Sequence, residues 1–599
     1  MGRSLRPDWH LDPNEDGPTY SLYNHIAISE NRVFARHISH CLVSRSDEAA
    51  EAQWKAQCGD LIVVLRSSVL HNIADDMIVK QIESRVTAAL VTLFELIQAK
   101  PWDVLLVLSG ILLVGNVLLV LRNRFCHLAS IPGPWWAAYT RLWLCKTIAS
   151  GDSARLFTEV NKKFGPIARI GPNHLITDDP DVTKRILAAR SHYTRGPWFD
   201  AIKIDPHVPN IVSERHTGKH NHLRHRMSAG YTGKEIEGTE EIIDERILDF
   251  CQRIEQKWCS ESSETKAFDI GRRIQYLAVD IITHLCFGAP LGFMDKDSDV
   301  HNFLYTIESQ LPIVQHFSVI TEFNTILERI TRIPLFRRLL LPSAADRTGV
   351  GRIMGISKKV VDKRFLPTSK PENDMLGSFL RHGLSAKEAE AEISISLVAG
   401  SDTTATSMRA TLLAIITNPA VYAKLQAEID EHIAANRISS PIKDQEARNL
   451  PYLQACILEG LRRFPPITQL REREVPPEGD IIHGHVIPGG TFIGLNAWGV
   501  QLNSVYGEDV EMFRPERWLE ADETRLRRMH DVHELIFGYG NTRCLGIRIA
   551  TMNLNKIFVE LLGRFDMSVV RPHRPWRSIC YGIFFQKDFD VRIMKRQTK

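Results

Sequence analysis

Cysteine is sparse in this chain, and its charges nearly cancel. The 10 cysteines among 599 residues are spread singly along almost the whole length, and no C-x-x-C pair occurs. This spacing disfavours a disulfide framework or a zinc ribbon and favours reduced, mostly buried thiols in a cytosolic protein. Lys plus Arg number 74 against 71 Asp plus Glu, and this net charge of +3 is too small to indicate a nucleic-acid partner.

Other absences narrow the architecture. No internal repeat and no low-complexity tract occur between Trp136 and Lys599, and no G-x-G-x-x-G fingerprint opens a βαβ unit. The composition, 44% hydrophobic and 24% charged, is that of a folded chain and argues against wholesale disorder or a fibrous architecture. We therefore expect one large catalytic domain over residues 136–599, without a flavin or nicotinamide domain of its own.

The first 103 residues carry no secretory signal, because a basic start and an apolar h-region are both missing. We treat residues 1–103 as an N-terminal extension of uncertain status. The next segment, residues 104–121, has no charge and would extend roughly 27 Å as a helix, close to the hydrocarbon thickness of a bilayer. It predicts a single transmembrane anchor, with a buried core helix as the alternative.

The flanks of this apolar segment predict its orientation and its link to the catalytic domain. Arg122 and Arg124 follow the segment, and this basic excess places the C-terminal side in the cytoplasm. Residues 122–135 form a linker that ends in Ile131-Pro132-Gly133-Pro134-Trp135, a stiff turn suited to redirecting the chain.

Helical signals dominate the catalytic domain. Ser385 and Glu388 form a capping box, and helical sequence continues from there to about Thr417, before Asn418-Pro419. A second helix starts near Pro451 and ends before Pro465-Pro466. Residues 486–493 indicate two short strands around a glycine turn. The fold class predicted is mainly α with small β-sheets, preceded by one transmembrane helix.

One cysteine lies in an unusual setting. The segment 537–546, FGYGNTRCLG, places three glycines and two aromatic residues around Cys544. Apolar residues then recur at helical spacing from Ile547 to Leu561, so Cys544 is predicted to lie at the mouth of a helix. Amide N–H groups and the helix dipole at such a mouth are expected to lower the pKa of the thiol. A thiolate held against a planar cofactor is one way in which proteins bind haem iron.

The pattern F-G-x-G, three residues, then C-x-G resembles the haem-binding loop of the cytochrome P450 family. The resemblance implies haem b as cofactor, with the Cys544 thiolate as axial ligand of the iron. It also implies that other residues of the loop contact the haem: Phe537, Gly540, Arg543 and Gly546. Many family members carry Arg or His two residues before the cysteine, whereas this chain has Thr542 there. A buried inert thiol and a protease nucleophile are the alternatives, but no signature of a catalytic base accompanies the cysteine.

Residues 399–404, AGSDTT, resemble the oxygen-activation motif of the same family. The resemblance implies that Asp402 and Thr403 relay the protons needed for O–O cleavage. A glycine in mid-helix is unfavourable, and the Thr403 hydroxyl is placed to bond the carbonyl of Ala399, so we expect a locally opened helix. A polar helix face that meets solvent is the alternative.

Two further sets of residues follow the family's order. Glu459 and Arg462 match its E-x-x-R, and Arg517 lies in a P-E-R-W segment, which together imply a buried structural charge cluster. His220 and Arg224 occupy the places of a W-x-x-x-R helix, and Arg473 resembles another arginine that binds a haem propionate. A solvated basic face is the alternative for these last three.

The resemblance covers about Pro132 to the C-terminus and is strongest to fungal members grouped around pisatin demethylase. It implies a monooxygenase that inserts one oxygen atom from O2 into a small, mainly apolar metabolite, by hydroxylation or demethylation. Electrons would come from NADPH through a separate cytochrome reductase carrying FAD and FMN, at the endoplasmic reticulum membrane. The alternatives are a reductase-independent isomerase or dehydratase and a non-catalytic haem-binding protein. Residues 195–211 and 467–470 are where similar enzymes line the substrate pocket.

Overall fold

The computed structural model describes residues 115, 127–233, 235–236, 238–261 and 264–596. The predicted extension and the predicted anchor at 104–121 therefore lie outside the described residues, except for Gly115. Among the described helices, none is both long enough and apolar enough to cross a membrane. The anchor and the domain boundaries stay predictions.

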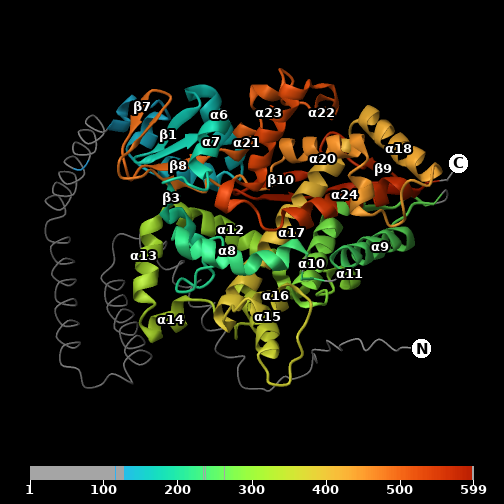
Figure 1. Cartoon of the computed structure of the whole chain (residues 1–599), viewed down its shortest axis with the longest axis horizontal. Helices are drawn as coiled ribbons and strands as arrows, with labels where there is room; N and C mark the ends of the chain where they lie inside the picture. Colours follow the sequence, from blue (N-terminus) through green and yellow to red (C-terminus); the bar gives the residue numbers. More distant parts are fainter. Residues whose placement is uncertain (1–114, 116–126, 234, 237, 262–263, 597–599) are drawn as a thin grey trace, which may run out of the picture. The chain divides into compact units, whose positions relative to one another are not determined.

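The described fold is mainly helical, as the sequence predicts (Figure 1). The α-helices are α5 (Leu142–Ala149), α6 (Ser153–Phe164), α7 (Pro180–Leu187), α8 (Thr217–Thr232), α9 (Thr239–Lys257), α10 (Ile270–Phe287), α11 (Phe293–Lys296), α12 (Phe303–Val319), α13 (Thr321–Ile330), α14 (Pro334–Leu340), α15 (Gly349–Arg364), α16 (Met375–Arg381), α17 (Ala386–Ile416), α18 (Pro419–Ala434), α19 (Asp444–Ala447), α20 (Pro451–Arg463), α21 (Ala497–Val500), α22 (Arg517–Glu520), α23 (Glu523–His533) and α24 (Ile547–Arg564). The 3-10 helices are η1 (His127–Ser130), η2 (Trp135–Ala138), η3 (Pro197–Ile202), η4 (Val300–Asn302), η5 (Ser504–Tyr506), η6 (Glu534–Phe537) and η7 (Gly540–Thr542).

The strands are short and form small sheets. They are β1 (Ile167–Gly171), β2 (His174–Thr177), β3 (Thr194–Arg195), β4 (Ala267–Asp269), β5 (Arg473–Glu474), β6 (Asp480–Ile482), β7 (His485–Ile487), β8 (Phe492–Leu495), β9 (Phe565–Val569), β10 (Arg577–Cys580), β11 (Phe584–Lys587) and β12 (Asp590–Lys595). The largest sheet has the order β1-β2-β8-β5-β3, and smaller sheets are β4-β12-β9, β6-β7 and β10-β11. Figure 1 shows β1, β3, β7 and β8 grouped at one side, whereas β9 and β10 lie among the helices.

The five-stranded sheet matters for the site because its last two strands bring distant residues together. The strands β3 and β5 are antiparallel, and their register sets Arg195 opposite Arg473. Strand β5 also pairs with β8, which runs parallel to β2. This edge of the sheet therefore presents two arginines that are far apart in the sequence.

The long helix α17 forms the centre of the helical part, where it contacts α10, α15, α20 and α24. Its start confirms the predicted capping box: the Ser385 side chain accepts from the Glu388 backbone N–H, and the Glu388 side chain accepts from the Ser385 backbone N–H. Most of its side chains are buried, which explains why the sequence has no single apolar stripe there. The helix is uninterrupted, so the local opening expected at Gly400 is not seen in its secondary structure.

The other predicted elements are present, with one difference. The helix predicted from Pro451 is α20, and the helix predicted after Cys544 is α24. Two strands occur near residues 486–493, but β7 pairs with β6 and β8 joins the five-stranded sheet. The two strands are therefore not partners of each other, because the glycine turn between them redirects the chain from one sheet to another.

Candidate active site

The loop that carries Cys544 is held by its backbone. The Cys544 N–H donates to the Phe537 carbonyl at 2.7 Å, which closes the loop. Gly538 and Gly540 adopt φ of +76° and +57°, in the left-handed region that favours glycine. A Cβ on Gly540 would lie 2.4 Å from the Leu187 carbonyl oxygen, so no larger residue fits there without movement. The glycines are thus required by the fold of this loop.

The Cys544 thiol opens onto a cavity while protein surrounds its other sides. Gly546 is the N-cap of α24, so the predicted place of Cys544 at a helix mouth is confirmed. Burial raises the pKa of the thiol, while the backbone N–H groups of Gly546 and Ile547 and the charge of Arg224 act in the lowering direction. The expected lowering of the pKa is therefore wrong for the protein alone, since desolvation outweighs the amides and the cation.

The cavity beside Cys544 is lined mainly by apolar side chains from elements spread over the whole fold. Including its open mouth, the space between its walls measures about 1530 Å³. An apolar lining around a few polar groups is typical of sites that bind small organic molecules. The apolar lining includes Leu187, Phe199, Ile211, Val212, Ala278, Ile281, Ile282, Ile395, Ile467, Leu495, Ile536 and Ile549.

Several of the predicted loop residues reach this cavity. Phe537, Arg543 and Gly546 line it together with Cys544, whereas Gly540 lies behind it against Leu187. The predicted pocket segments contribute Arg195, Phe199, Ile211 and Ile467 among their residues.

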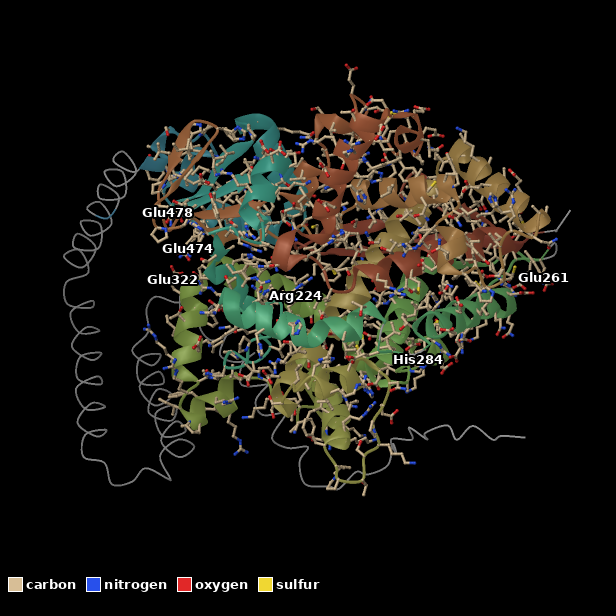
Figure 2. The ribbon with its side chains drawn as sticks, viewed as in Figure 1. Arg224, Glu261, His284, Glu322, Glu474 and Glu478 are labelled. Atoms are coloured by element: carbon tan, nitrogen blue, oxygen red, sulfur yellow. The ribbon has the colours of Figure 1, made fainter. Side chains whose placement is uncertain are left out.

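Cationic side chains gather at one end of the cavity. The guanidinium groups of Arg195 and Arg473 both lie 5.0 Å from the centre of the Phe199 ring. His220 Nε2 lies 3.0 Å from Arg195 Nη2, and Arg224 donates to the Arg543 carbonyl at 2.6 Å. Figure 2 labels Arg224 on α8, near the middle of the molecule.

Among the described residues these cations form no ion pair with a carboxylate, although the charge of Glu214 acts on Arg195 and opposes the lowering of its pKa by burial. No carboxylate pairs with Arg195, Arg224 or Arg473 within the part of the chain that the structure describes. Burial, together with the neighbouring charge of Arg195, holds the pKa of Arg473 far below its ordinary value. Burial also lowers the pKa of His220 to about 4, so this residue is a neutral hydrogen-bonding group near neutral pH. Like charges set opposite each other are unfavourable, and the arrangement calls for bound anions.

Asp402 and Thr403, the acid and the alcohol of the 399–404 segment, lie in different surroundings. Thr403 lines the cavity, and its hydroxyl donates to the Ala399 carbonyl at 2.7 Å, as the sequence predicts. Asp402 is buried outside the cavity, where Gln275 of α10 donates a hydrogen bond to its Oδ1. Its Oδ2 has no partner among the described residues. Burial raises the pKa of Asp402 to about 6, against the lowering effects of Arg409 and Gln275.

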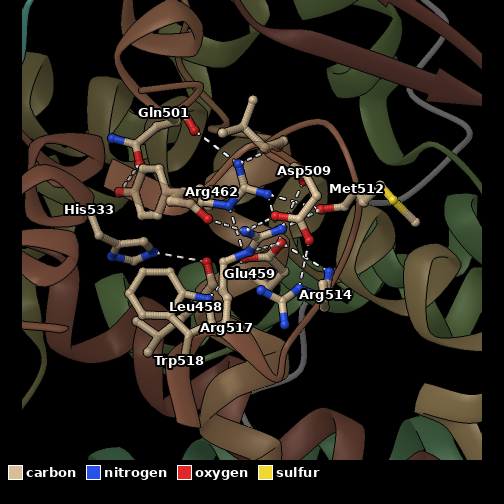
Figure 3. Close-up of polar contacts among 12 residues, drawn as sticks. Leu458, Glu459, Arg462, Gln501, Asp509, Met512, Arg514, Arg517, Trp518 and His533 are labelled. Atoms are coloured by element: carbon tan, nitrogen blue, oxygen red, sulfur yellow. Dashed lines mark hydrogen bonds and ion pairs between the residues drawn. The ribbon is translucent and has the colours of Figure 1, made fainter. Parts of the chain in front are cut away.

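The predicted charge cluster is present and is completely enclosed (Figure 3). Glu459 Oε1 accepts from Arg462 Nη2 at 2.7 Å, Arg517 Nε at 3.0 Å and the Arg514 N–H at 3.1 Å. Glu459 Oε2 accepts from Arg462 Nε and Trp518 Nε1, both at 2.9 Å. Burial opposes ionisation of Glu459, but the hydrogen bonds and charges of its arginine neighbours hold its pKa below the ordinary value.

The same arginines also tie the surrounding loop to α20. Arg462 donates to the carbonyls of Gln501, Val510 and Met512 at 3.0, 2.7 and 3.1 Å. Arg517 donates to Asp509 Oδ1 at 2.8 Å. The cluster therefore fixes the segment that leads to the Cys544 loop, which is a structural role.

Sequence reasoning did not assign three residues that the structure brings to this region. Arg195 was expected only as part of a pocket segment, and Gln275 and Arg471 were not singled out. Arg195 faces Arg473 only because β3 pairs with β5. Nothing in the local sequence of any of the three signals its position.

The fold and the site together define a mainly helical protein that binds a planar anionic cofactor beside a cysteine. The donor set fits haem: Cys544 would bind the iron, and Arg195, Arg224, Arg473 and the neutral His220 would hold the two propionates. Glycines at 538 and 540 let the backbone approach closely.

Comparison with known proteins agrees with this class. The family described as "Cytochrome P450" matches residues 130–587. A "Cytochrome P450 monooxygenase ABA1" of Pyricularia oryzae is 39% identical over 500 residues, covering 82% of this chain and 97% of the relative. A "Cytochrome P450 monooxygenase aba1" of Botryotinia fuckeliana is 35% identical, covering 78% and 92%. The pisatin demethylase of Fusarium vanettenii is 26% identical, covering 84% and 96%.

The chain belongs to the cytochrome P450 family. It is an oxidoreductase whose cofactor is haem with a cysteine thiolate as axial ligand. Enzymes of this family use O2 and an organic substrate, and typically a separate redox partner. The predicted likeness to pisatin demethylase is confirmed, at lower identity than the likeness to the two ABA1 proteins.

Proposed function

We propose that this chain inserts one oxygen atom from O2 into a small, mainly apolar organic substrate and releases the other as water. Electrons come from NADPH through a separate flavoprotein reductase that carries FAD and FMN. The observation that supports this most is the cavity itself, which is lined mainly by apolar side chains and reaches both Cys544 and Thr403. The haem supplies the oxygen chemistry when bound, and the protein supplies the thiolate, the dry pocket and positioned protons.

Thr403 and Asp402 have separate parts in proton delivery. The Thr403 hydroxyl lies at the cavity wall, where it can hydrogen-bond a water molecule or hold a proton next to the substrate. Asp402 lies one position back, next to Gln275 and away from the cavity. A carboxyl with a pKa near 6 exchanges its proton readily near neutral pH, which suits a donor that resupplies the hydroxyl.

The test is a comparison of Thr403→Ala with a matched hydroxyl on the same helix. Ser401 also bonds a carbonyl one turn back, Leu397 at 2.8 Å, but does not line the cavity, so Ser401→Ala is the control. We expect Thr403→Ala to keep its haem and to divert electrons, so that NADPH and O2 yield H2O2 and less product per NADPH. Ser401→Ala should keep the coupling of the unmodified protein. Full coupling in Thr403→Ala would contradict the assignment.

The same assay separates the two alternatives. Turnover that does not need NADPH would favour an isomerase or a dehydratase. Failure to consume NADPH with every ligand that shifts the haem spectrum would favour a non-catalytic haem-binding protein. The ligand itself is tested first: the reduced, carbon-monoxide-bound protein should absorb at the long wavelength typical of thiolate ligation, and Cys544→His should abolish this band.

We further propose that the protein is a single-pass protein of the endoplasmic reticulum membrane with its catalytic domain in the cytosol. The uncharged run 104–121 supports this. Large apolar side chains are also exposed on and around α13 and α14, and such a patch suits contact with lipid. These residues are Ile320, Phe323, Ile326, Ile330, Ile333, Leu335, Phe336, Leu339 and Leu340.

The membrane proposal is tested by alkaline carbonate extraction of microsomes. The full chain should stay in the membrane pellet, and a chain lacking residues 104–121 should be released. Retention of the deleted chain would assign the anchoring to another segment.

A further inference from the structure

Arg471 is a charged residue of the cavity wall whose guanidinium has no partner in the described part of the chain. Arg471 lines the cavity, as do Pro466, Ile467 and Leu495. Within the described residues, its guanidinium makes no hydrogen bond, ion pair or ring contact, and its buried Nε is without a partner. Burial alone lowers its pKa to about 10, so Arg471 still carries its charge near neutral pH. A charge in such a place is costly unless a ligand neutralises it.

The other arginines of the cavity differ from Arg471. Arg195, Arg224 and Arg473 each donate to backbone carbonyls, which fixes their guanidinium groups. Arg195, His220 and Arg473 also line a recess next to the main cavity, and Arg471 does not. The two propionates of one haem are matched by these fixed arginines, and Arg471 is left without an anion.

The backbone holds Arg471 in its place. Its φ is +44°, a conformation that residues other than glycine adopt rarely and that is often retained at binding sites. Arg473 Nη1 donates to the Arg471 carbonyl at 2.7 Å, which secures this conformation.

The carboxyl of the adjacent residue, Glu472, does not serve as a counter-ion to Arg471. Its Oε1 lies 3.8 Å from His174 Nε2. Burial raises the pKa of Glu472 to about 8, and the charge that acts on it is that of Arg141, not that of Arg471.

We propose that Arg471 binds a carboxylate group of the substrate, whose remainder is apolar. The proposal rests on the proposed function and names the substrate class for the same cavity. One guanidinium matches one carboxylate through two parallel N–H···O bonds. The apolar lining suits the rest of the molecule, and a salt bridge at one end would fix which part of the substrate lies toward Thr403 and Cys544.

The test measures binding, not turnover, with two matched pairs of probes: dodecanoic acid and its methyl ester, and 4-cyclohexylbutanoic acid and its methyl ester. The full chain is used with haem bound, and its haem content is measured from the carbon-monoxide spectrum. The affinity for each probe is measured from the shift that the probe causes in the haem spectrum. The unmodified protein should bind at least one acid more tightly than its ester. Arg471→Leu should weaken the binding of that acid about 30-fold or more and leave the ester unchanged.

Two further variants make the result specific. Arg471→Lys keeps the charge but loses the two-pronged geometry, so it should recover only part of the preference for the acid. Arg437→Leu removes an exposed arginine that pairs with Glu431 and should change neither affinity.

Several results would overturn the proposal. The proposal is wrong if the acids do not bind or bind no better than their esters. It is also wrong if Arg471→Leu keeps the preference for the acid. Loss of haem in Arg471→Leu would reassign this arginine to a propionate. By contrast, an unmodified protein without the thiolate band would count against the proposed function itself, before any probe is added.

Discussion

Glu459 provides the sharpest test of how the charge cluster stabilises this fold. The substitution Glu459→Gln keeps the shape of the side chain and removes its charge. The amide oxygen can replace Oε1, which accepts from Arg462, Arg517 and the Arg514 N–H. The amide nitrogen then takes the place of Oε2 and meets two donors, Arg462 Nε and Trp518 Nε1, without accepting from either.

The magnitude follows from these contacts. Two buried donors lose their acceptor, Arg462 loses its counter-charge, and Arg517 keeps only its pair with Asp509, which together cost about 3 kcal/mol of unfolding free energy. For a folded domain of about 470 residues, the unfolding entropy converts this into a fall of about 3 °C in Tm. Glu431→Gln is the control, because Glu431 is 71% exposed in its pair with Arg437 and should change stability by less than about 0.5 kcal/mol.

The assay is urea unfolding of both variants, followed by the haem band and by circular dichroism. The pH dependence adds a second check. Because Glu459 has a lowered pKa in the fold, its contribution is present above its unfolded pKa and is lost as pH falls through the folded value. The gap between the unmodified protein and Glu459→Gln should therefore shrink below about pH 4.5. Equal midpoints for Glu459→Gln and Glu431→Gln at neutral pH would refute the reasoning.

Three further outcomes are expected. The turnover rate should fall as pH rises through about 6, where Asp402 loses its proton, and Asp402→Asn should lack this limb and be slower by about a hundredfold; a limb retained in Asp402→Asn would assign it to another group. Gly540→Ala should lower the haem content of the purified protein because its Cβ would lie 2.4 Å from the Leu187 oxygen, whereas Gly563→Ala in α24, with 3.6 Å of clearance, should not. Deletion of residues 1–76 should leave haem content and membrane association unchanged, and loss of either would show that these residues belong to the functional protein.

Local sequence was enough to predict the elements on which the site is built. The capping box at Ser385, the prolines around α20 and the glycines before α24 act over a few residues, so each leaves a readable pattern. The family motifs gave further information, because their order along the chain predicted the cofactor and the mainly helical fold. The comparisons support both. The charge cluster was predictable for the same reason, although its enclosure by backbone carbonyls was not.

What depended on tertiary structure was the environment of each group. The pKa of the Cys544 thiol rises because burial outweighs the helix mouth, and the amount of protein around a residue cannot be read from its neighbours in sequence. His220 is neutral for the same reason.

The positions of the remaining arginines likewise required the fold. Arg195 became part of the cationic end of the cavity through the pairing of β3 with β5, which joins segments far apart in the chain. Arg471 is distinguished by a left-handed backbone and by a guanidinium that has no partner within the described residues. The sequence by itself determined which chemical groups this protein contains and which elements carry them. Burial and long-range pairing, which arise only when those elements pack, decided which groups are charged and which still need a ligand.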